Sequence, residues 1–182
     1  HEQCMTACAE IEKTFGPIDI MVNNAGITRD ATLVKMTYEQ WEEAIRVDLS
    51  GCFSMAKAVF AGMRERKWGR IVNVGSVNGQ GGQIGQVNYA AAKSGIHGFT
   101  RSLAMEGARF GVTANAIAPG YIATEMLATI PENVMDKIVA QIPVGRLGQA
   151  EEIARGVEFL TSDNAGFVTG STLSINGGMH MY

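Results

Sequence analysis

The sequence predicts an α/β fold, built as a doubly wound parallel sheet with helices on both faces. Amphipathic helical patterns alternate with short apolar runs along the 182 residues, as they do in chains of strand-helix-strand units. The apolar runs show little polar alternation, which is typical of strands buried on both sides. Glycine, asparagine or proline follows several of these runs, at the positions where open α/β sheets bind their ligands.

Periodicity and terminating residues justify each element in turn. In the first helix Met5, Cys8 and Ile11 share one face. Gly16-Pro17 ends that helix, because proline disfavours helix in the residue before it. Thr37 is placed to cap the second helix. In order, we expect a helix over 2–15, a strand over 18–22, a helix over 38–65, a strand over 70–75, a helix over 89–110, a strand over 112–118, helices over 131–141 and 150–160, and a strand over 171–175.

Composition argues against several classes of function. A net charge of -3 without a basic run argues against nucleic acid as a partner. No apolar stretch reaches the ~20 residues of a membrane span and no signal pattern opens the chain, so we expect a cytoplasmic protein without a membrane partner. Cys4, Cys8 and Cys52 fit neither a disulfide framework nor a zinc spacing, and we interpret them as reduced packing residues. The histidines are scattered, so no metal site is expected.

Three strand ends carry unusual residues. Asn23-Asn24-Ala25-Gly26 follows the first strand, Gly75-Ser76 ends the second, and Pro119-Gly120 ends the third. Because the carboxyl ends of parallel strands meet at one edge of a sheet, we expect these segments to converge on one crevice.

Tyr89 and Lys93 lie four residues apart at the start of a helix, so their side chains project from one face. A cation near a phenol stabilises the phenolate and lowers the pKa, which suits the pair to general acid and base chemistry. Ser76 ends a strand, and a glycine-rich loop over 77–88 returns the chain to the same crevice, where the hydroxyl would hold a substrate carbonyl. The alternative is that Ser76 caps a turn and Tyr89 packs in the core.

Together with Pro119-Gly120-Tyr121-Ile122-Ala123-Thr124, these motifs occur in the order found in the short-chain dehydrogenase/reductase family, which the sequence resembles over essentially its whole length. The resemblance implies a Rossmann-type fold, commonly a homotetramer, with hydride passing from NAD(P)H to a carbonyl carbon. It also implies that Ser76 orients the carbonyl and that Tyr89 donates the proton. Lys93 would lower the pKa of Tyr89 and bond the nicotinamide ribose.

Further cofactor contacts are implied by the same resemblance. The residues are Asn24, Ala25, Gly26, Ile27, Thr28, Tyr89, Lys93, Pro119, Gly120, Ile122 and Thr124. For the first group, the alternative is a turn that only ends a strand. Where the family usually has an Asn-x-x-Gly element, this chain has Asp48-Leu49-Ser50-Gly51. Asp48 is therefore a fourth candidate catalytic residue, acting through its main chain or by shifting neighbouring pKa values, and a purely structural aspartate is the alternative.

The family's first strands, its glycine-rich phosphate-binding turn and the residues that choose between NAD and NADP have no counterpart in these 182 residues. We expect a single domain over 1–182 that corresponds to the carboxyl-terminal two-thirds of a family member, with an exposed apolar edge on the strand over 18–22. We also expect these residues alone not to reduce substrate. The resemblance implies NADPH/NADP as cofactor, with NADH as the alternative.

Within the family, the loop sequences are most similar to the acetoacetyl-CoA reductases of polyhydroxyalkanoate synthesis and next to the 3-oxoacyl-[acyl-carrier-protein] reductases of fatty acid synthesis. This implies NADPH-dependent reduction of a 3-oxoacyl thioester carried on coenzyme A or on acyl-carrier protein. Substrate contacts are implied for Asp30, Gln83, Ile84, Gly85, Gln86 and Tyr121. The two glutamines offer amide donors and acceptors beside Tyr89, and the alternative is that they only satisfy loop backbone groups.

Two further interpretations stay open. Residues 123–144 are rich in methionine and small apolar residues, which predicts either a mobile lid over the substrate or ordinary packing of a helix pair through Met126, Leu127, Ile130 and Met135. A function of another class is a catalytically inactive fragment or oligomerisation module, because the helices over 38–65 and 89–110 carry broad apolar stripes.

Overall fold

A computed structural model describes residues 1–124 and 131–181. Its centre is a four-stranded sheet in the order β1-β2-β3-β4, and every neighbouring pair is parallel. The strands are β1 (Ile20–Asn23), β2 (Gly69–Val74), β3 (Val112–Pro119) and β4 (Thr172–Ile175). This arrangement confirms the predicted α/β fold with a parallel sheet.

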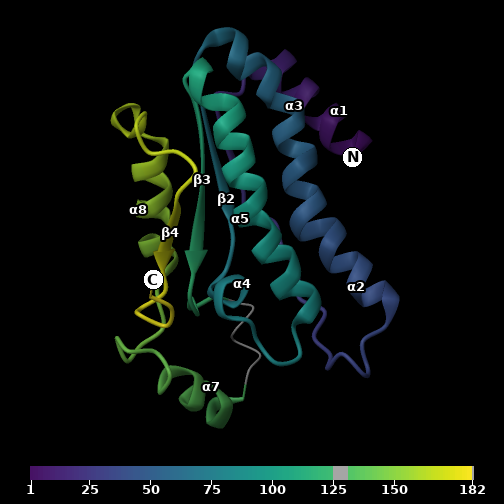
Figure 1. Ribbon diagram of the computed structural model, residues 1–182, viewed down its shortest axis with the longest axis vertical. Helices are drawn as coiled ribbons and strands as arrows, with labels where there is room; N and C mark the ends of the chain where they lie inside the picture. Colours follow the sequence, from purple (N-terminus) through teal and green to yellow (C-terminus); the bar gives the residue numbers. More distant parts are fainter. Residues whose placement is uncertain (125–130, 182) are drawn as a thin grey trace.

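Helices cover both faces of the sheet (Figure 1). The α-helices are α1 (Glu2–Phe15), α2 (Tyr38–Ala44), α3 (Gly51–Arg66), α4 (Val77–Gly81), α5 (Val87–Gly107), α7 (Glu132–Val139) and α8 (Ala150–Thr161). In Figure 1, α3 and α5 lie on one side of the strands and α8 lies on the other, while α4 and α7 lie near the lower end, toward which the arrowheads of β3 and β4 point. The carboxyl ends of the strands therefore face α4 and α7.

The core has one half on each face of the sheet. Met21, Ile71 and Ala114 are neighbours across β1, β2 and β3, and they pack against α1, α3 and α5. Val72 and Ile117 point to the other face, where Leu160 of α8 covers them. Burying each large apolar side chain contributes roughly 1.5–3 kcal/mol. These contacts hold the strand ends in register.

One face of β1 is open. Helix α8 contacts β2, β3 and β4, whereas Ile20 and Val22 on β1 keep 45% and 39% of their surface exposed. The expected exposure of apolar surface on this edge strand is therefore confirmed.

Several element boundaries follow the local signals. Helix α1 ends where predicted: Gly16 adopts a φ of 92°, and its N–H bonds to the carbonyl of Glu12. Helix α2 begins with a capping box, in which the Thr37 side chain accepts from Gln40 N and the Gln40 side chain accepts from Thr37 N.

Two features differ from the expectation. The long helix predicted over 38–65 contains a π-helical segment, η1 (Ile45–Ser50), between α2 and α3. The stretch predicted as a loop over 77–88 begins with the short helix α4. Neither follows from hydrophobic periodicity, because a π turn alters the period for one turn only and α4 is rich in glycine.

Candidate active site

Buried asparagines fix the strand ends that lead to the site. Asn23 of β1 donates to Asn73 Oδ1 of β2 at 2.8 Å, and Asn73 donates to Thr100 Oγ1 of α5 at 2.9 Å. All three side chains are buried. Because a buried amide without partners is costly, this chain of bonds holds β1, β2 and α5 in a single arrangement. Asn23 is therefore more than a residue that ends a strand.

Ser76 is held at the end of β2 by α4. Its hydroxyl oxygen accepts from the main-chain N–H of Asn78 at 3.1 Å and caps this helix. Helix α4 packs directly on α5, because Gly79 has no side chain: a Cβ there would lie 2.7 Å from the carbonyl carbon of Lys93. The Ser94 hydroxyl also donates to the carbonyl of Gly79. Ser76 therefore caps α4, as the alternative interpretation expected, and it also lies at the crevice where the strand ends meet.

Tyr89 and Lys93 lie in the first two turns of α5. The start of this helix is anchored by Asn88, whose amide donates to the carbonyls of Arg29 and Gln40 at 3.0 Å each and whose Oδ1 accepts from Tyr89 N. Lys93 Nζ lies 5.5 Å from the centre of the Tyr89 ring. The expected pairing of the two side chains on one helix face is therefore present.

Asp48 connects Lys93 to the segment that follows β1. The carboxylate lies in η1 with none of its surface exposed. Its Oδ1 accepts from Ile27 N at 2.8 Å, and its Oδ2 lies 3.8 Å from Lys93 Nζ. Lys93 also donates to the carbonyl of Val74 at 2.9 Å. A Cβ on Gly26 would lie 3.1 Å from Lys93 Nζ, so a side chain at this position would crowd the ammonium.

Burial dominates the electrostatics of these groups. Desolvation raises the pKa of Asp48, although the Ile27 N–H and Lys93 oppose the shift. Desolvation also lowers the pKa of Lys93, against the influence of Asp48. The Lys93 ammonium is thus harder to keep charged than an exposed one, and Asp48 is the principal group that supports its charge.

The pKa of Tyr89 shifts in the direction opposite to the expected one, and the lowering effect expected from Lys93 stays a prediction. Burial raises the pKa of Tyr89, a hydrogen bond with Ser76 lowers it, and Asp48 is among the groups that raise it further. Lys93 is not among the groups that shift it. The physical reason is that the ammonium lies over the ring and is directed toward Val74 and Asp48, while the phenol is largely removed from water.

Two adjoining cavities share Ser76, Tyr89 and Gly120. The first, here the Lys93 cavity, has a volume of about 170 Å³. Its lining consists of Asn24, Gly26, Ile27, Val74, Gly75, Ser76, Tyr89, Lys93, Pro119 and Gly120. The second, here the Asn78 cavity, has a volume of about 180 Å³. Its lining consists of Thr28, Ser76, Val77, Asn78, Gln86, Tyr89, Gly120, Tyr121, Ile122 and Thr124. The three predicted strand ends therefore meet at one place.

Most of the residues expected at the site line these cavities, and a few do not. Ala25 lines a different hollow beside α1. Gln83 and Ile84 are exposed, Ile84 by 91%, and Gly85 offers its carbonyl to Ala31 N at 2.9 Å. Their predicted contacts with substrate stay predictions. Of the expected lid, Met126, Leu127 and Ile130 lie outside the described residues, and Met135 lies half-buried on α7.

Sequence analysis missed several lining residues, among them Val74, whose carbonyl accepts from Lys93, and two residues of α4. Val77 and Asn78 follow Ser76 directly and form the first turn of α4. The signal that points to them is the serine itself, because a capping serine places the next two residues in the same turn. Asn78 in particular brings an amide into the cavity beside the reactive hydroxyls.

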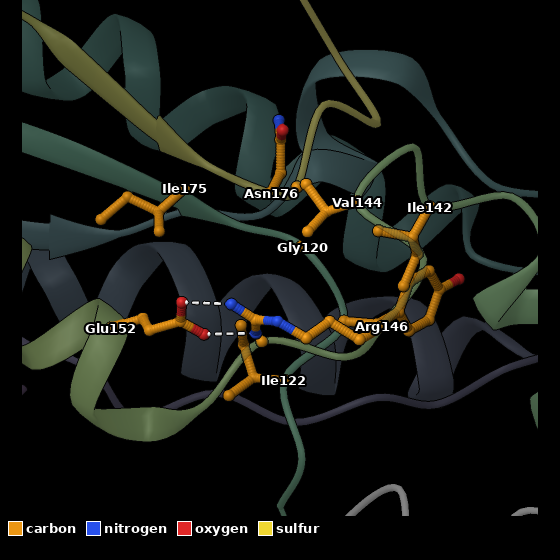
Figure 2. A pocket seen from close by; sticks show the side chains of 11 residues that line it. Gly120, Ile122, Ile142, Val144, Arg146, Glu152, Ile175 and Asn176 are labelled. Carbon is orange, nitrogen blue, oxygen red and sulfur yellow. Dashed lines mark hydrogen bonds and ion pairs between the residues drawn. The ribbon is translucent and has the colours of Figure 1, made fainter.

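A third cavity, of about 100 Å³, is also lined by the segment from Gly120 to Ile122. Figure 2 shows apolar side chains on its walls, among them Ile142, Val144 and Ile175, with Arg146 and Glu152 joined by two hydrogen bonds. It contains none of the hydroxyl, phenol or ammonium groups described above. It lies behind the segment from Gly120 to Ile122, and its two charged side chains, Arg146 and Glu152, are paired with each other.

No cluster of metal-ligating side chains is found among residues 1–124 and 131–181. In the same ranges, no helix is both long enough and apolar enough to cross a bilayer.

Known proteins resemble this chain over nearly its whole length. A family model described as enoyl-(acyl carrier protein) reductase matches residues 1–180. Acetoacetyl-CoA reductase of Rhizobium meliloti is 58% identical over 181 residues, which cover 99% of this chain and 75% of the relative. Acetoacetyl-CoA reductase of Cupriavidus necator is 52% identical, covering 97% and 72%. A 3-oxoacyl-[acyl-carrier-protein] reductase of Pseudomonas aeruginosa is 49% identical, covering 99% and 73%.

Proposed function

Because this chain belongs to the short-chain dehydrogenase/reductase family, we propose that it reduces a 3-oxoacyl thioester, acetoacetyl-CoA, to the 3-hydroxyacyl thioester with NADPH. The observation that carries the proposal is the meeting of Ser76, Tyr89 and Lys93 at two adjoining cavities. Several relatives at 50–58% identity are named acetoacetyl-CoA reductase, and these names support the thioester substrate.

The Lys93 cavity suits the nicotinamide end of such a cofactor. Lys93 Nζ has three donors, and one of them bonds to Val74 O, so donors are left for ribose hydroxyls. Gly26 lines the same cavity and places no side chain against the ammonium. The cofactor, when bound, supplies hydride to the carbonyl carbon. The residues proposed to hold it are Asn24, Ala25, Gly26, Ile27, Thr28, Tyr89, Lys93, Pro119, Gly120, Ile122 and Thr124.

The chain's own residues handle the oxygen of the reacting carbonyl. The Ser76 hydroxyl oxygen accepts from Asn78 N, and its O–H, which bonds with the Tyr89 phenol in this structure, turns to donate to the carbonyl when substrate binds. The Tyr89 phenol transfers its proton to the same oxygen as the alcohol forms. Its raised pKa keeps the phenol protonated at neutral pH, as a proton donor must be. Asp48 sustains the charge of Lys93 and acts as a positioning residue.

A second candidate substrate is a 3-oxoacyl group on acyl-carrier protein. The Pseudomonas aeruginosa relative favours it, because it bears that name at 49% identity. The proposed substrate contacts are Asp30, Gln83, Ile84, Gly85, Gln86 and Tyr121, of which Gln86 and Tyr121 line the Asn78 cavity. The same reductase chemistry serves both carriers, so the choice is one of affinity.

Further parts of the proposal concern setting and assembly. We place the enzyme in the cytoplasm, in polyhydroxybutyrate synthesis, as a homotetramer. The groove between α3 and α5, lined by Phe53, Phe60 and Phe99, supports subunit packing, since Phe53 keeps 49% of its surface exposed.

A side-by-side assay tests the function. Acetoacetyl-CoA, acetoacetyl-carrier protein and a simple diketone are compared at equal NADPH, and the highest kcat/KM is expected for acetoacetyl-CoA. Tyr89→Phe removes the proton donor while keeping the ring, so turnover is expected to fall by roughly 10³-fold with oligomer mass unchanged. A Tyr89→Phe enzyme within tenfold of the original rate would contradict the proton-donor role.

A further inference from the structure

We propose that Asn78 selects substrates that carry a hydrogen-bond donor beyond the thioester, and that Asp30 and Gln86 are positioning residues that orient its amide. The inference rests on the proposed function, because it concerns how the same cavity tells one thioester from another. It assigns the polar contact to Asn78, since the amide of Gln86 is already engaged.

A line of hydrogen bonds joins these three residues. Gln86 Nε2 donates to Asp30 Oδ2 at 2.9 Å. At the other end of the same amide, Gln86 Oε1 accepts from Asn78 Nδ2 at 2.9 Å. The line links the segment after β1, the start of α5 and the first turn of α4, which are far apart in sequence.

The carboxylate fixes the direction of every bond in the line. An ionised Asp30 offers acceptors only, so Gln86 must turn its nitrogen toward it. Gln86 Oε1 then faces Asn78, so Asn78 must donate to it through Nδ2. Asn78 Oδ1 is consequently the atom turned away from Gln86, and it has no hydrogen-bond partner within the residues that the structure describes.

Asn78 stands beside the reacting groups. It lines the same cavity as Ser76, Tyr89 and Tyr121, and its main-chain N–H bonds to Ser76 Oγ at 3.1 Å. The side chain is half-buried, so the free oxygen is reachable from the cavity. An acceptor at this position pairs with an N–H or O–H of a ligand and repels a lone pair.

The chemistry of the substrate supplies one such donor. A 3-oxoacyl thioester carries acceptors only at its two carbonyls, whereas the pantetheine-type arm beyond the sulfur carries amide N–H groups. The donor that Asn78 Oδ1 can recognise therefore belongs to the arm. This distinguishes a thioester on coenzyme A or carrier protein from a plain ketone.

A matched pair of substrates isolates that donor. S-(2-acetamidoethyl) acetothioacetate contains the first amide of the arm, and S-(2-acetoxyethyl) acetothioacetate replaces its N–H by an ester oxygen with the same heavy-atom skeleton. With the complete protein and NADPH, kcat/KM is expected to be about tenfold higher for the amide, the usual effect of one hydrogen bond. The measured quantity is the amide-to-ester ratio.

Variants assign the ratio to the line of bonds. Asn78→Leu keeps the size of the side chain and removes its acceptor, so the ratio is expected near one. Asp30 is exposed, and Asp30→Asn replaces its carboxylate by an amide that can accept or donate, so the Gln86 amide is no longer held in one orientation and the amide-to-ester ratio is expected to fall. Asp30→Glu keeps a carboxylate, so the ratio is expected to recover. Asn164→Leu is the control, since Asn164 is exposed at the opposite end of the sheet, and its ratio is expected to match the original.

The outcomes separate this inference from the proposed function. Reduction of both thioesters with a ratio near one in the unaltered protein overturns the role of Asn78 and leaves the reductase standing. A preference for the amide that persists in Asn78→Leu overturns it as well. Failure to reduce either thioester overturns the proposed function itself. Because each test is a ratio within one variant, partial loss of folded protein does not disguise the result.

Discussion

Two buried cations lie at opposite ends of the sheet, and their surroundings differ. Arg70, at the amino end of β2, and Lys93, beside its carboxyl end, are each only 3% exposed. Arg70 stacks on Trp68 at 4.5 Å and donates to four carbonyls, those of Gly69, Gly111, Ser162 and Asp163. Lys93 donates to one carbonyl and faces Asp48 at 3.8 Å.

Burial lowers the pKa of both cations. At Arg70 the guanidinium donors bond to carbonyl oxygens of the protein, so this group stabilises the fold. At Lys93 donors remain beside a cavity, and a buried charge left so incompletely bonded is unfavourable unless a ligand completes it. Both cations are buried, so burial does not distinguish them. What distinguishes Lys93 from Arg70 is that some of its N–H donors have no hydrogen-bond partner among residues 1–124 and 131–181.

The largest expected effect comes from Lys93→Met. The variant removes the cation beside Tyr89, and kcat/KM is expected to fall by roughly 10³-fold. The midpoint of thermal unfolding at pH 7 is expected to fall by only a few degrees, because Asp48 loses its counter-charge while the desolvation cost of the buried amine is removed. Steady-state kinetics and calorimetry on the same sample measure both. A rate within tenfold of the original would break the comparison.

Arg70→Met is the matched substitution at the other end, and its expected profile is reversed. Four carbonyls lose a charged donor, so the free energy of unfolding is expected to fall by roughly 3 kcal/mol. The kcat/KM of the folded fraction is expected to remain unchanged. Denaturant unfolding and active-site titration measure these quantities. Loss of rate without loss of stability would contradict the structural role.

Asp48→Asn sharpens the contrast through pH. Asp48 raises the pKa of Lys93 and of Tyr89, so a neutral amide lets both pKa values fall. Reduction needs a charged ammonium and a protonated phenol, so the alkaline limb of the kcat/KM profile is expected to move to lower pH. Profiles between pH 6 and 10 measure the shift, with Asp19→Asn as an exposed control. An alkaline limb that does not move contradicts the coupling.

The same substitution has a signature in stability. The pKa of Asp48 is raised in the folded state, so the folded protein holds this proton more tightly than the unfolded chain. Stability of the original protein is therefore lost as pH rises above the ordinary value of 3.8 and through the folded pKa. Asp48→Asn escapes that loss, so the melting temperature of the variant is expected to rise relative to that of the original protein between pH 4 and pH 7.

The smallest effect is expected at the exposed pair in Figure 2. The Arg146 guanidinium, and then Gln149 N–H, lower the pKa of Glu152 to about 2. This contribution is present above pH 4.5 and is lost as pH falls toward 2. Glu152→Gln is expected to lower the melting temperature slightly at pH 7, and the difference should narrow below pH 4.5. A difference that stays constant with pH would assign it to packing.

Much of the fold could be predicted from sequence because its signals are local. Gly16-Pro17 ends α1, and Thr37 with Gln40 caps α2, through bonds within a few residues. Helix α4 could not be predicted in this way. It depends on the contact of Gly79 with the backbone of α5, which joins residues that only the folded chain brings together.

The same distinction between local signals and contacts formed only in the folded chain applies to the site. The spacing of Tyr89 and Lys93 and the strand-end position of Ser76 predict that the three meet. The direction of the Tyr89 pKa shift could not be predicted, because it depends on how deeply the phenol is buried and on where the ammonium points. The place of Asn78 was missed for a related reason: its bond to Gln86 crosses from one element to another.

The π-helical segment η1 makes the site sensitive to the deletion of a single residue in this part of the chain. Gly51 N–H bonds to the carbonyl of Arg46, five residues back, so this turn holds one residue more than an α turn. The surplus residue advances the helical phase by about 100° between α2 and α3. Deleting one codon from 45–47 would let the helix close into a regular ladder, and it would turn Asp48 relative to α2 and away from its present position beside Lys93. A shortened gene could thus encode a sound helix and a disconnected active site.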